Sequence, residues 1–200
     1  MSKKELIDEY RARQEHFKNI ERIAKFQLNN ALKSQIKVHS LQSRIKSFDS
    51  FSEKVKSKNL KDPFKQVKDL VGLRIVCLFL SDLKKVGEII RRTFKLISEE
   101  DKIDEHPKDV FGYMDVQYIV VLKNRPKLGI ESMQFEIQVR TIAQDAWASV
   151  SHELYYKKEE AIPKDWERDF YALSALFYVA DQHFKMLHQQ TLSELILNSY

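Results

Sequence analysis

The run from Phe135 to Thr141 alternates apolar with polar side chains, and its polar members are residue types that do chemistry. Alternate positions of a strand share a face, so Glu136, Gln138 and Arg140 should line up on one side of it. A packed core needs no such trio, whereas a carboxylate, an amide and a guanidinium in one row can bind a metal ion and a polyphosphate. For an isolated pattern of this kind, an amphipathic edge strand that merely meets water would be the better interpretation.

A second element places an acid and an arginine at the start of another apolar run. Asp69 and Arg74 stand on either side of Gly72, ahead of the apolar segment that contains Cys77. Magnesium prefers carboxylate oxygens and keeps several waters, so Asp69 and Glu136 together would be enough to hold one ion. We therefore predict that these two acids project to the same edge of one sheet.

A third element supplies positive charge earlier in the chain. Its members are three cations and a hydroxyl, at Arg44, Lys46, Lys54 and Ser50. Glu53 follows Ser50 at the spacing of a capping box, which predicts a helix that begins at Ser50 and carries Lys54 in its first turn. The free N–H groups of that helix end would then face an anion. A solvated, lysine-rich helix surface is the alternative interpretation.

Length, charge and composition set the frame for these elements. The 200 residues suit one domain with a sizeable core, and they carry a formal net charge of +5. Residues 1–60 hold 14 Lys and Arg against 7 Asp and Glu, which favours a polyanionic partner such as nucleotide phosphates or RNA. No stretch is apolar enough to span a bilayer and no signal peptide begins the chain, so we expect a cytoplasmic protein without a membrane partner. The single cysteine, Cys77, is expected in the core.

Hydrophobic periodicity predicts an α+β fold, with a mixed sheet of about five strands flanked by helices and with long helices at both ends. Residues 4–37 have the apolar spacing of one long helix. The other predicted helices are 82–93, 142–157 and 165–196, the predicted strands are 73–80, 94–98, 116–122 and 133–141, and a polar loop covers 99–111. We expect a single domain made of a basic helical part with the donor-site cations (1–60), a catalytic sheet with its helices (61–157) and a C-terminal helix (158–200).

A fourth element, Pro107-Lys108 followed by Gly112-Tyr113, completes an ordered set. In this order the elements resemble the synthetase domain of the RelA/SpoT family, the alarmone synthetases that move pyrophosphate from ATP to a guanosine nucleotide. The resemblance runs from about residue 37 to 157. It implies the nucleotidyltransferase-like synthetase fold, Mg²⁺ as cofactor, and ATP with GDP or GTP as substrates. Small members often form symmetric tetramers through terminal helices, so a homo-oligomer is also an expectation.

The resemblance implies roles for the first three elements. Asp69 matches the metal-binding aspartate, and Glu136 matches the glutamate that helps to bind the metal or activates the attacking hydroxyl. These two are the expected catalytic residues and metal ligands. The residues expected to bind ATP, with Arg44 and Arg74 flanking the adenine, match the family's R-x-K-x3-S-x3-K element and one further arginine: Arg44, Lys46, Ser50, Lys54 and Arg74.

The acceptor side follows the family less closely. Tyr113 matches the tyrosine on which the acceptor guanine stacks, but the family pattern G-Y-x-S-x-H has Asp115 and Gln117 here in place of serine and histidine. An acid where a nucleotide phosphate passes costs affinity unless a cation pairs with it. Asp115 and Gln117 could equally be ordinary strand-edge residues. The residues expected to bind the acceptor are Lys108, Tyr113, Gln117, Gln138, Arg140 and Ala148.

Three functions from different classes follow. The first is a small alarmone synthetase that makes ppGpp or pppGpp. The second is a toxic relative that pyrophosphorylates the 3′ end of tRNA, blocks translation and needs an antitoxin partner; the basic N-terminal part and the altered segment at Asp115 favour it. The third is a binding protein that kept the fold and lost turnover. The presence of Asp69, Arg74 and Glu136 argues against the third.

Overall fold

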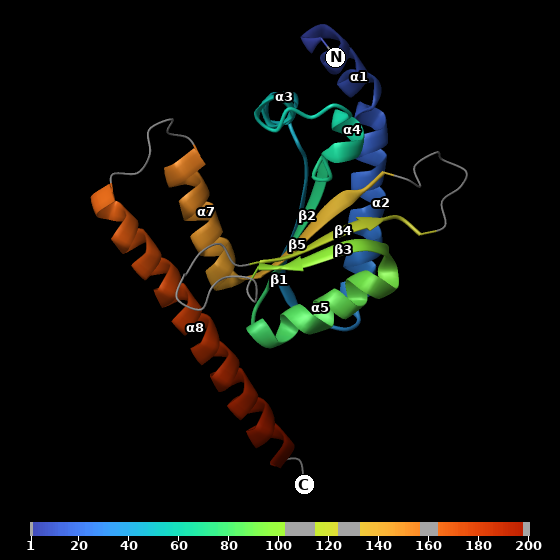
Figure 1. Ribbon diagram of the computed structural model, residues 1–200. Coiled ribbons are helices and arrows are strands. Elements are labelled where there is room, and N and C mark those ends of the chain that lie inside the picture. Colours follow the sequence, from blue (N-terminus) through green and yellow to red (C-terminus); the bar gives the residue numbers. More distant parts are fainter. Residues whose placement is uncertain (1, 103–114, 124–132, 157–163, 198–200) are drawn as a thin grey trace.

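A five-stranded mixed sheet forms the centre of the computed structural model, which describes residues 2–102, 115–123, 133–156 and 164–197 (Figure 1). The strands are β1 (Val38–Ile45), β2 (Val71–Cys77), β3 (Lys95–Asp101), β4 (Val116–Val121) and β5 (Phe135–Thr141). Their order across the sheet is β1-β2-β5-β4-β3. Only β2 and β5 pair in parallel, whereas the other neighbours are antiparallel. The α+β class and the mixed sheet predicted from the sequence are confirmed.

One face of the sheet is apolar and carries the core. Along β5, Phe135, Ile137 and Val139 are fully buried, as the alternating pattern requires. Two amphipathic helices, α2 (Gln14–Lys33) and α5 (Leu80–Thr93), cover this face and contact each other as well as the strands. The opposite face is left to the polar members of the same strands.

Three short helices pack beside the start of the sheet. They are α1 (Lys3–Ala12), α3 (Phe48–Ser57) and the single turn α4 (Pro63–Gln66). Tyr10 of α1 contacts α2 and α3, because its ring packs against Phe17, Phe48 and Phe51, and its hydroxyl donates a hydrogen bond to the carbonyl of Lys46 at 2.6 Å. This contact holds the backbone at the end of β1, where two of the predicted donor-site cations lie.

Two helices stand together at one end of the sheet, α7 (Ile142–Tyr156) directly after β5 and the long α8 (Lys164–Leu197) (Figure 1). Trp147 of α7 is buried and lies 4.1 Å from Phe170 of α8, ring centroid to ring centroid. Further along α8, Asp181 accepts a hydrogen bond from the hydroxyl of Thr141 at 2.5 Å, which ties α8 to the last residue of β5. No helix among the described residues has the length and apolarity to cross a membrane.

The structure differs from the sequence-based expectations in the first third of the chain. The predicted helix over 4–37 is two helices that meet at Arg13, where the N–H group bonds the carbonyls of Glu9 and Tyr10, and the second helix ends at Lys33. Strand β1 is not among the strands predicted from the sequence. Its solvent-facing residues are polar and its inward-facing residues are only partly apolar, so it lacks a clear alternating pattern. Strand β3 reaches Asp101, so the first residues of the predicted loop over 99–111 are extended.

The helix that carries Lys54 also begins earlier than predicted. Ser47, not Ser50, is the N-cap of α3, because its side chain accepts a hydrogen bond from the N–H of Ser50 at 3.3 Å. Lys54 therefore lies in the last turn of α3 rather than the first. The predicted anion site at a helix N-terminus beside Lys54 is wrong, and Lys54 must act through its side chain alone.

Candidate functional site

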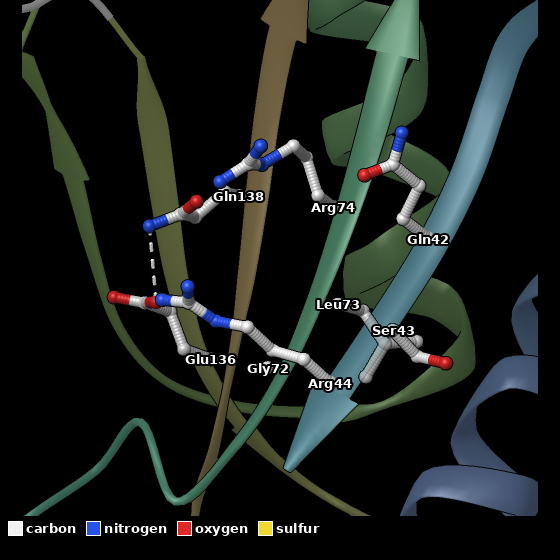
Figure 2. Close-up of a pocket in the computed structure, with 8 residues that line it drawn as sticks. All are labelled: Gln42, Ser43, Arg44, Gly72, Leu73, Arg74, Glu136 and Gln138. Atoms are coloured by element: carbon white, nitrogen blue, oxygen red, sulfur yellow. Dashed lines mark hydrogen bonds between the residues drawn. The ribbon is translucent and has the colours of Figure 1, made fainter. Parts of the chain in front are cut away.

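A pocket of about 230 Å³ opens on the polar face of the sheet, across β1, β2 and β5 (Figure 2). Register explains its composition. Arg44, Gly72 and Glu136 lie opposite one another on the three strands, and so do Gln42, Arg74 and Gln138 two residues further along. The pocket is lined by Gln42, Ser43, Arg44, Gly72, Leu73, Arg74, Glu136 and Gln138. Four of the residues predicted from the sequence thus share one hollow.

Asp69 lies just before β2, between two lysines. Its Oδ1 is 2.9 Å from Nζ of Lys54, and its Oδ2 is 3.0 Å from Nζ of Lys46. Burial on its own would raise the pKa of Asp69, but the hydrogen bonds and charges of Lys54 and Lys46 outweigh burial and hold the pKa below its usual value. Asp69 is therefore a carboxylate at neutral pH, in a strongly positive setting.

Glu136 is the second carboxylate of the site. Burial raises its pKa, and the negative charges of Asp69 and Asp115 add to the effect, while the charges of Lys54 and Arg44 oppose it. The effect of Asp69 on Glu136 means that the two carboxylates are close enough to repel each other. A divalent cation would relieve that repulsion, and two carboxylates with water and phosphate oxygens suit Mg²⁺. The described residues contain no cluster of three or more His, Cys, Asp or Glu side chains, and Asp69 and Glu136 remain the predicted metal ligands.

The remaining predicted donor-site residues differ in how firmly they are held. Arg44 is exposed, and no ion pair or hydrogen bond ties its side chain to the other described residues. Arg74 is partly buried and its Nη1 lies 3.2 Å from Oδ1 of Asp145 in α7. Ser50 is turned toward its own helix, where its hydroxyl accepts a hydrogen bond from Ser47 at 3.0 Å. The structure thus gathers the cations around the pocket and leaves Ser50 in the first turn of α3.

The acceptor side contains a buried group of charges that the sequence did not predict as a unit. Arg140 is only 2% exposed, and its Nη2 lies 3.4 Å from Oδ2 of Asp115, which is fully buried. Its Nη1 lies 3.4 Å from Asp145, the same carboxylate that Arg74 contacts. Burial and the charge of Arg74 lower the pKa of Arg140 to about 9, which leaves it protonated at neutral pH. The sequence predicts that Arg140 binds the acceptor. In the structure, its guanidinium group is instead buried between two carboxylates.

Two glutamines complete this group. The side-chain NH2 of Gln117 donates hydrogen bonds to both oxygens of Asp115, at 3.3 and 3.2 Å. Burial raises the pKa of Asp115 to about 6, and the hydrogen bond from Gln117 opposes that rise. Gln138 lies between Arg140 and Glu136 and bonds to both. Arg140 therefore forms the ion pair with the acid at position 115, and the charges of Lys102 and Arg74 also oppose the rise in its pKa.

Three other acceptor-side expectations have different outcomes. Lys108 and Tyr113 lie outside the residues that the structure describes. Ala148 is buried in α7 beside Trp147, where it packs rather than faces the pocket.

Cys77, expected in the core, is fully buried, and burial raises its pKa to about 12, so its thiol stays protonated.

Sequence reasoning missed Asp145 and the partnership of Asp115 with Arg140. Asp145 is an acid in the first turn of the helix that follows β5, which is a common place for a carboxylate and gave no signal of its own. The pairing of Asp115 with Arg140 depends on the antiparallel register of β4 and β5, in which Val116 lies opposite Val139. Only a predicted register would have brought the two charges together.

Comparison with known proteins places this site in a family. Residues 43–161 match the sequence pattern described as "Region found in RelA / SpoT proteins". GTP pyrophosphokinase YwaC from Bacillus subtilis (strain 168) is 31% identical over 156 residues, which cover 75% of this chain and 72% of that protein. The family match over residues 43–161 includes every residue that lines the pocket except Gln42.

Solved structures share the fold at lower identity. A GTP pyrophosphokinase family protein from Streptococcus pneumoniae superposes with a TM-score of 0.82 at 20% identity, over 94% of this chain and 97% of that one. Small alarmone synthetase 1 from Bacillus subtilis, bound to its product pppGpp, gives a TM-score of 0.78 at 24% identity, over 92% of this chain and 97% of that one. These structures show the shared fold, whereas the match over residues 43–161 and the 31% identity to the Bacillus subtilis relative establish that the chain belongs to the RelA/SpoT family.

Proposed function

We propose that the protein is a pyrophosphokinase that transfers the β,γ-pyrophosphate of ATP to the 3′-hydroxyl of GDP or GTP, giving ppGpp or pppGpp and releasing AMP. The observation that carries the proposal is the pair of carboxylates: Glu136 lines the pocket with Arg44 and Arg74, and Asp69, whose charge acts on Glu136, lies between Lys46 and Lys54. The matched relative is named a GTP pyrophosphokinase, and a structure of the same fold was solved with pppGpp, named as its product.

The chemistry explains why these residue types belong together. A bond forms between the acceptor's 3′ oxygen and the β-phosphorus of ATP, and the bond from that phosphorus to the oxygen bridging to the α-phosphate breaks, so that AMP leaves. Glu136 accepts the proton of the attacking hydroxyl, and the rise in its pKa caused by burial makes it a stronger base than an exposed glutamate. Lys46, Lys54 and Arg44 neutralise the phosphate charge that must gather in front of them.

A divalent ion fits the same pocket. Asp69 and Glu136 would hold Mg²⁺, which when bound supplies further neutralisation of the pyrophosphate charge. Each oxygen of Asp69 already accepts from one lysine, and a carboxylate oxygen has a second lone pair available. The two lysines thus keep Asp69 ionised and oriented for the ion rather than exclude it.

A labelling experiment tests the proposal directly. The protein is incubated with γ-labelled ATP and Mg²⁺ and, separately, with GDP, GTP, ADP or deacylated tRNA, and the labelled products are separated. We expect label in the guanosine nucleotide, AMP in equal amount, and no transfer after the divalent ion is chelated. Label in tRNA alone would instead support the toxin-like function, whose antitoxin would then be sought. No labelled product with any acceptor would contradict pyrophosphate transfer altogether.

A further inference from the structure

A row of hydrogen-bonded polar side chains runs across β4 and β5 and ends on the proposed catalytic glutamate. Gln117 donates to both oxygens of Asp115, at 3.3 and 3.2 Å. Arg140 donates to Oδ2 of Asp115 at 3.4 Å and, from the same Nη2, to Oε1 of Gln138 at 3.0 Å. Gln138 in turn donates from Nε2 to Oε2 of Glu136 at 3.1 Å, the contact drawn in Figure 2. The row therefore links position 115 to position 136.

The chemistry of its members fixes the direction of every bond in this row. A guanidinium has donors only, so Gln138 must turn its oxygen toward Arg140. An ionised carboxylate has acceptors only, so Glu136 must receive the NH2 group of the same amide. One orientation of the Gln138 amide satisfies both neighbours and the flipped orientation satisfies neither. Arg140 therefore decides which end of Gln138 faces Glu136.

Arg140 can do this only while it stays buried at its present place. A buried guanidinium needs compensating charge, and the structure provides two carboxylates, Asp115 and Asp145. Asp145 is shared with Arg74, so it cannot balance both guanidinium groups alone. Asp115 thus supplies the second negative charge, and its full burial gives it no solvent to turn toward.

We propose that Asp115 is a positioning residue that acts through Arg140 to hold the Gln138 amide with its NH2 group on Glu136. The proposal rests on the proposed function only for the role of Glu136, because the orientation of Gln138 is a property of the fold itself. It gives a purpose to the aspartate that stands where the family pattern has serine.

The first test is the kinetics of Asp115→Asn, which removes the charge at nearly constant volume. We expect kcat for pyrophosphate transfer to fall roughly 10- to 100-fold, which is the usual effect of removing a residue that orients a functional group without touching the substrate. The KM for ATP should change less than twofold, because Lys46 and Lys54 lie on other elements. Asp181→Asn is the matched control, since Asp181 is also a buried aspartate with a raised pKa but lies outside the row. Its kcat should stay within twofold of the unmodified protein.

A double-mutant cycle separates positioning from general loosening of the fold. If Asp115 acts through Gln138, then Asp115→Asn should lower kcat less than twofold in a Gln138→Ala background. A loss as large as that in the unmodified background would mean that Asp115 acts by another route, and would overturn the proposal. An unchanged kcat in the Asp115→Asn single variant would overturn it as well.

A measurement without substrate keeps the proposal independent of the reaction. In ¹⁵N-resolved NMR spectra, the Gln138 side-chain NH2 signals can be assigned by their disappearance in Gln138→Ala. We expect these protons to exchange with water at least tenfold more slowly than those of the exposed Gln14, and to lose that protection in Asp115→Asn. Exchange as fast as at Gln14 in the unmodified protein would overturn the proposal, even if the aspartate variant failed to fold. Protected Gln138 protons without any nucleotide transfer would instead contradict only the proposed function.

Discussion

The two sides of the pocket use charge in opposite ways. On the donor side, three cations, Arg44, Lys46 and Lys54, face the single acid Asp69, and the two lysines are 14% and 30% exposed. On the acceptor side, Arg140 and the predicted donor-site residue Arg74, which shares Asp145 with it, are matched by Asp115 and Asp145. The donor side therefore carries an excess of positive charge near solvent, while the acceptor side is balanced and largely closed.

This difference teaches what each side can be for. Unbalanced positive charge at an open surface is costly for the protein alone and is relieved by a polyphosphate, so it favours binding. A balanced, buried network gains nothing from an anion, but it fixes the side chains that belong to it. Substitutions on the donor side should change substrate affinity, whereas substitutions on the acceptor side should change stability or the rate of the chemical step.

The largest expected effect is at the junction of the two sides. Glu136→Gln removes the proposed proton acceptor and one proposed metal ligand, so we expect kcat to fall about 10³-fold or more. Asp69→Asn should have a comparable effect, because it removes the other metal ligand. Circular dichroism spectra should still show a folded protein, although Asp69→Asn also removes the ion pairs with Lys46 and Lys54 and should lower the melting temperature. Full transfer activity in either variant would remove that residue from the mechanism.

The second-largest effect is expected from a substitution that removes one charge from the balanced network on the acceptor side. Arg140→Met leaves Asp115 buried without its ion-pair partner, which we expect to lower the free energy of unfolding by about 3–5 kcal/mol at pH 8. The pKa of Asp115 is already raised to about 6, so protonation below that pH should remove the stray charge and reduce the loss. Urea unfolding at pH 8 and pH 5 measures both quantities. Equal losses at the two pH values would show that the cost is not electrostatic.

A third substitution compares the paired Asp115 with Asp181, a buried acid without a cation partner among the described residues. Asp181 in α8 is buried, and among the described residues no cation pairs with it. Burial raises its pKa to about 6, above the value in an unfolded chain, so its ionisation makes the folded protein less stable as the pH rises from about 4 to 7.

Asp181→Asn should therefore raise the free energy of unfolding by about 3 kcal/mol at pH 7.5 and change it little at pH 4. An asparagine oxygen can still accept the hydrogen bond from Thr141. Denaturant midpoints of the two proteins, measured across this pH range, give the difference. A gain at pH 4 that equals the gain at pH 7.5 would contradict the electrostatic origin.

The smallest effect is expected on the open side. Arg44→Ala should raise the KM for ATP about tenfold, since it removes one phosphate or adenine contact, and should leave the free energy of unfolding within about 0.5 kcal/mol. Arg22→Ala, which removes an exposed arginine from α2, is the control for net charge and should leave the KM unchanged. If Arg44→Ala destabilised the protein as Arg140→Met does, the contrast between the two sides would be wrong.

Sequence alone predicted those parts of the site that follow from a local pattern. The alternation from Phe135 to Thr141 places Glu136 and Gln138 on one face of β5, and the apolar run after Asp69 predicts a buried strand that the structure confirms as β2. The strand β1 was missed because edge strands have weak alternation. The predicted N-cap of α3 lies three residues after the observed one. Both Ser47 and Ser50 can cap a helix, and only the backbone geometry distinguishes them.

The buried network was out of reach for a different reason. Asp115, Arg140 and Asp145 come from three elements, and their meeting depends on strand register and on the angle at which α7 leaves β5. Neither quantity can be predicted from a local pattern of residue types. For the same reason, the sequence predicts Arg140 as a ligand contact, whereas the structure shows it buried between carboxylates.

The parallel pairing of β2 with β5 has a consequence for how activity is acquired during folding. These two strands are far apart in the chain, and their pairing sets Gly72 beside Glu136 and so brings Asp69 near it. Contacts between distant segments form late, because closing a long loop costs entropy before any contact is gained. A nascent or partly unfolded chain would thus hold all the reactive groups yet assemble no catalytic centre, so that pyrophosphate transfer should appear only when the last long-range strand pair has closed.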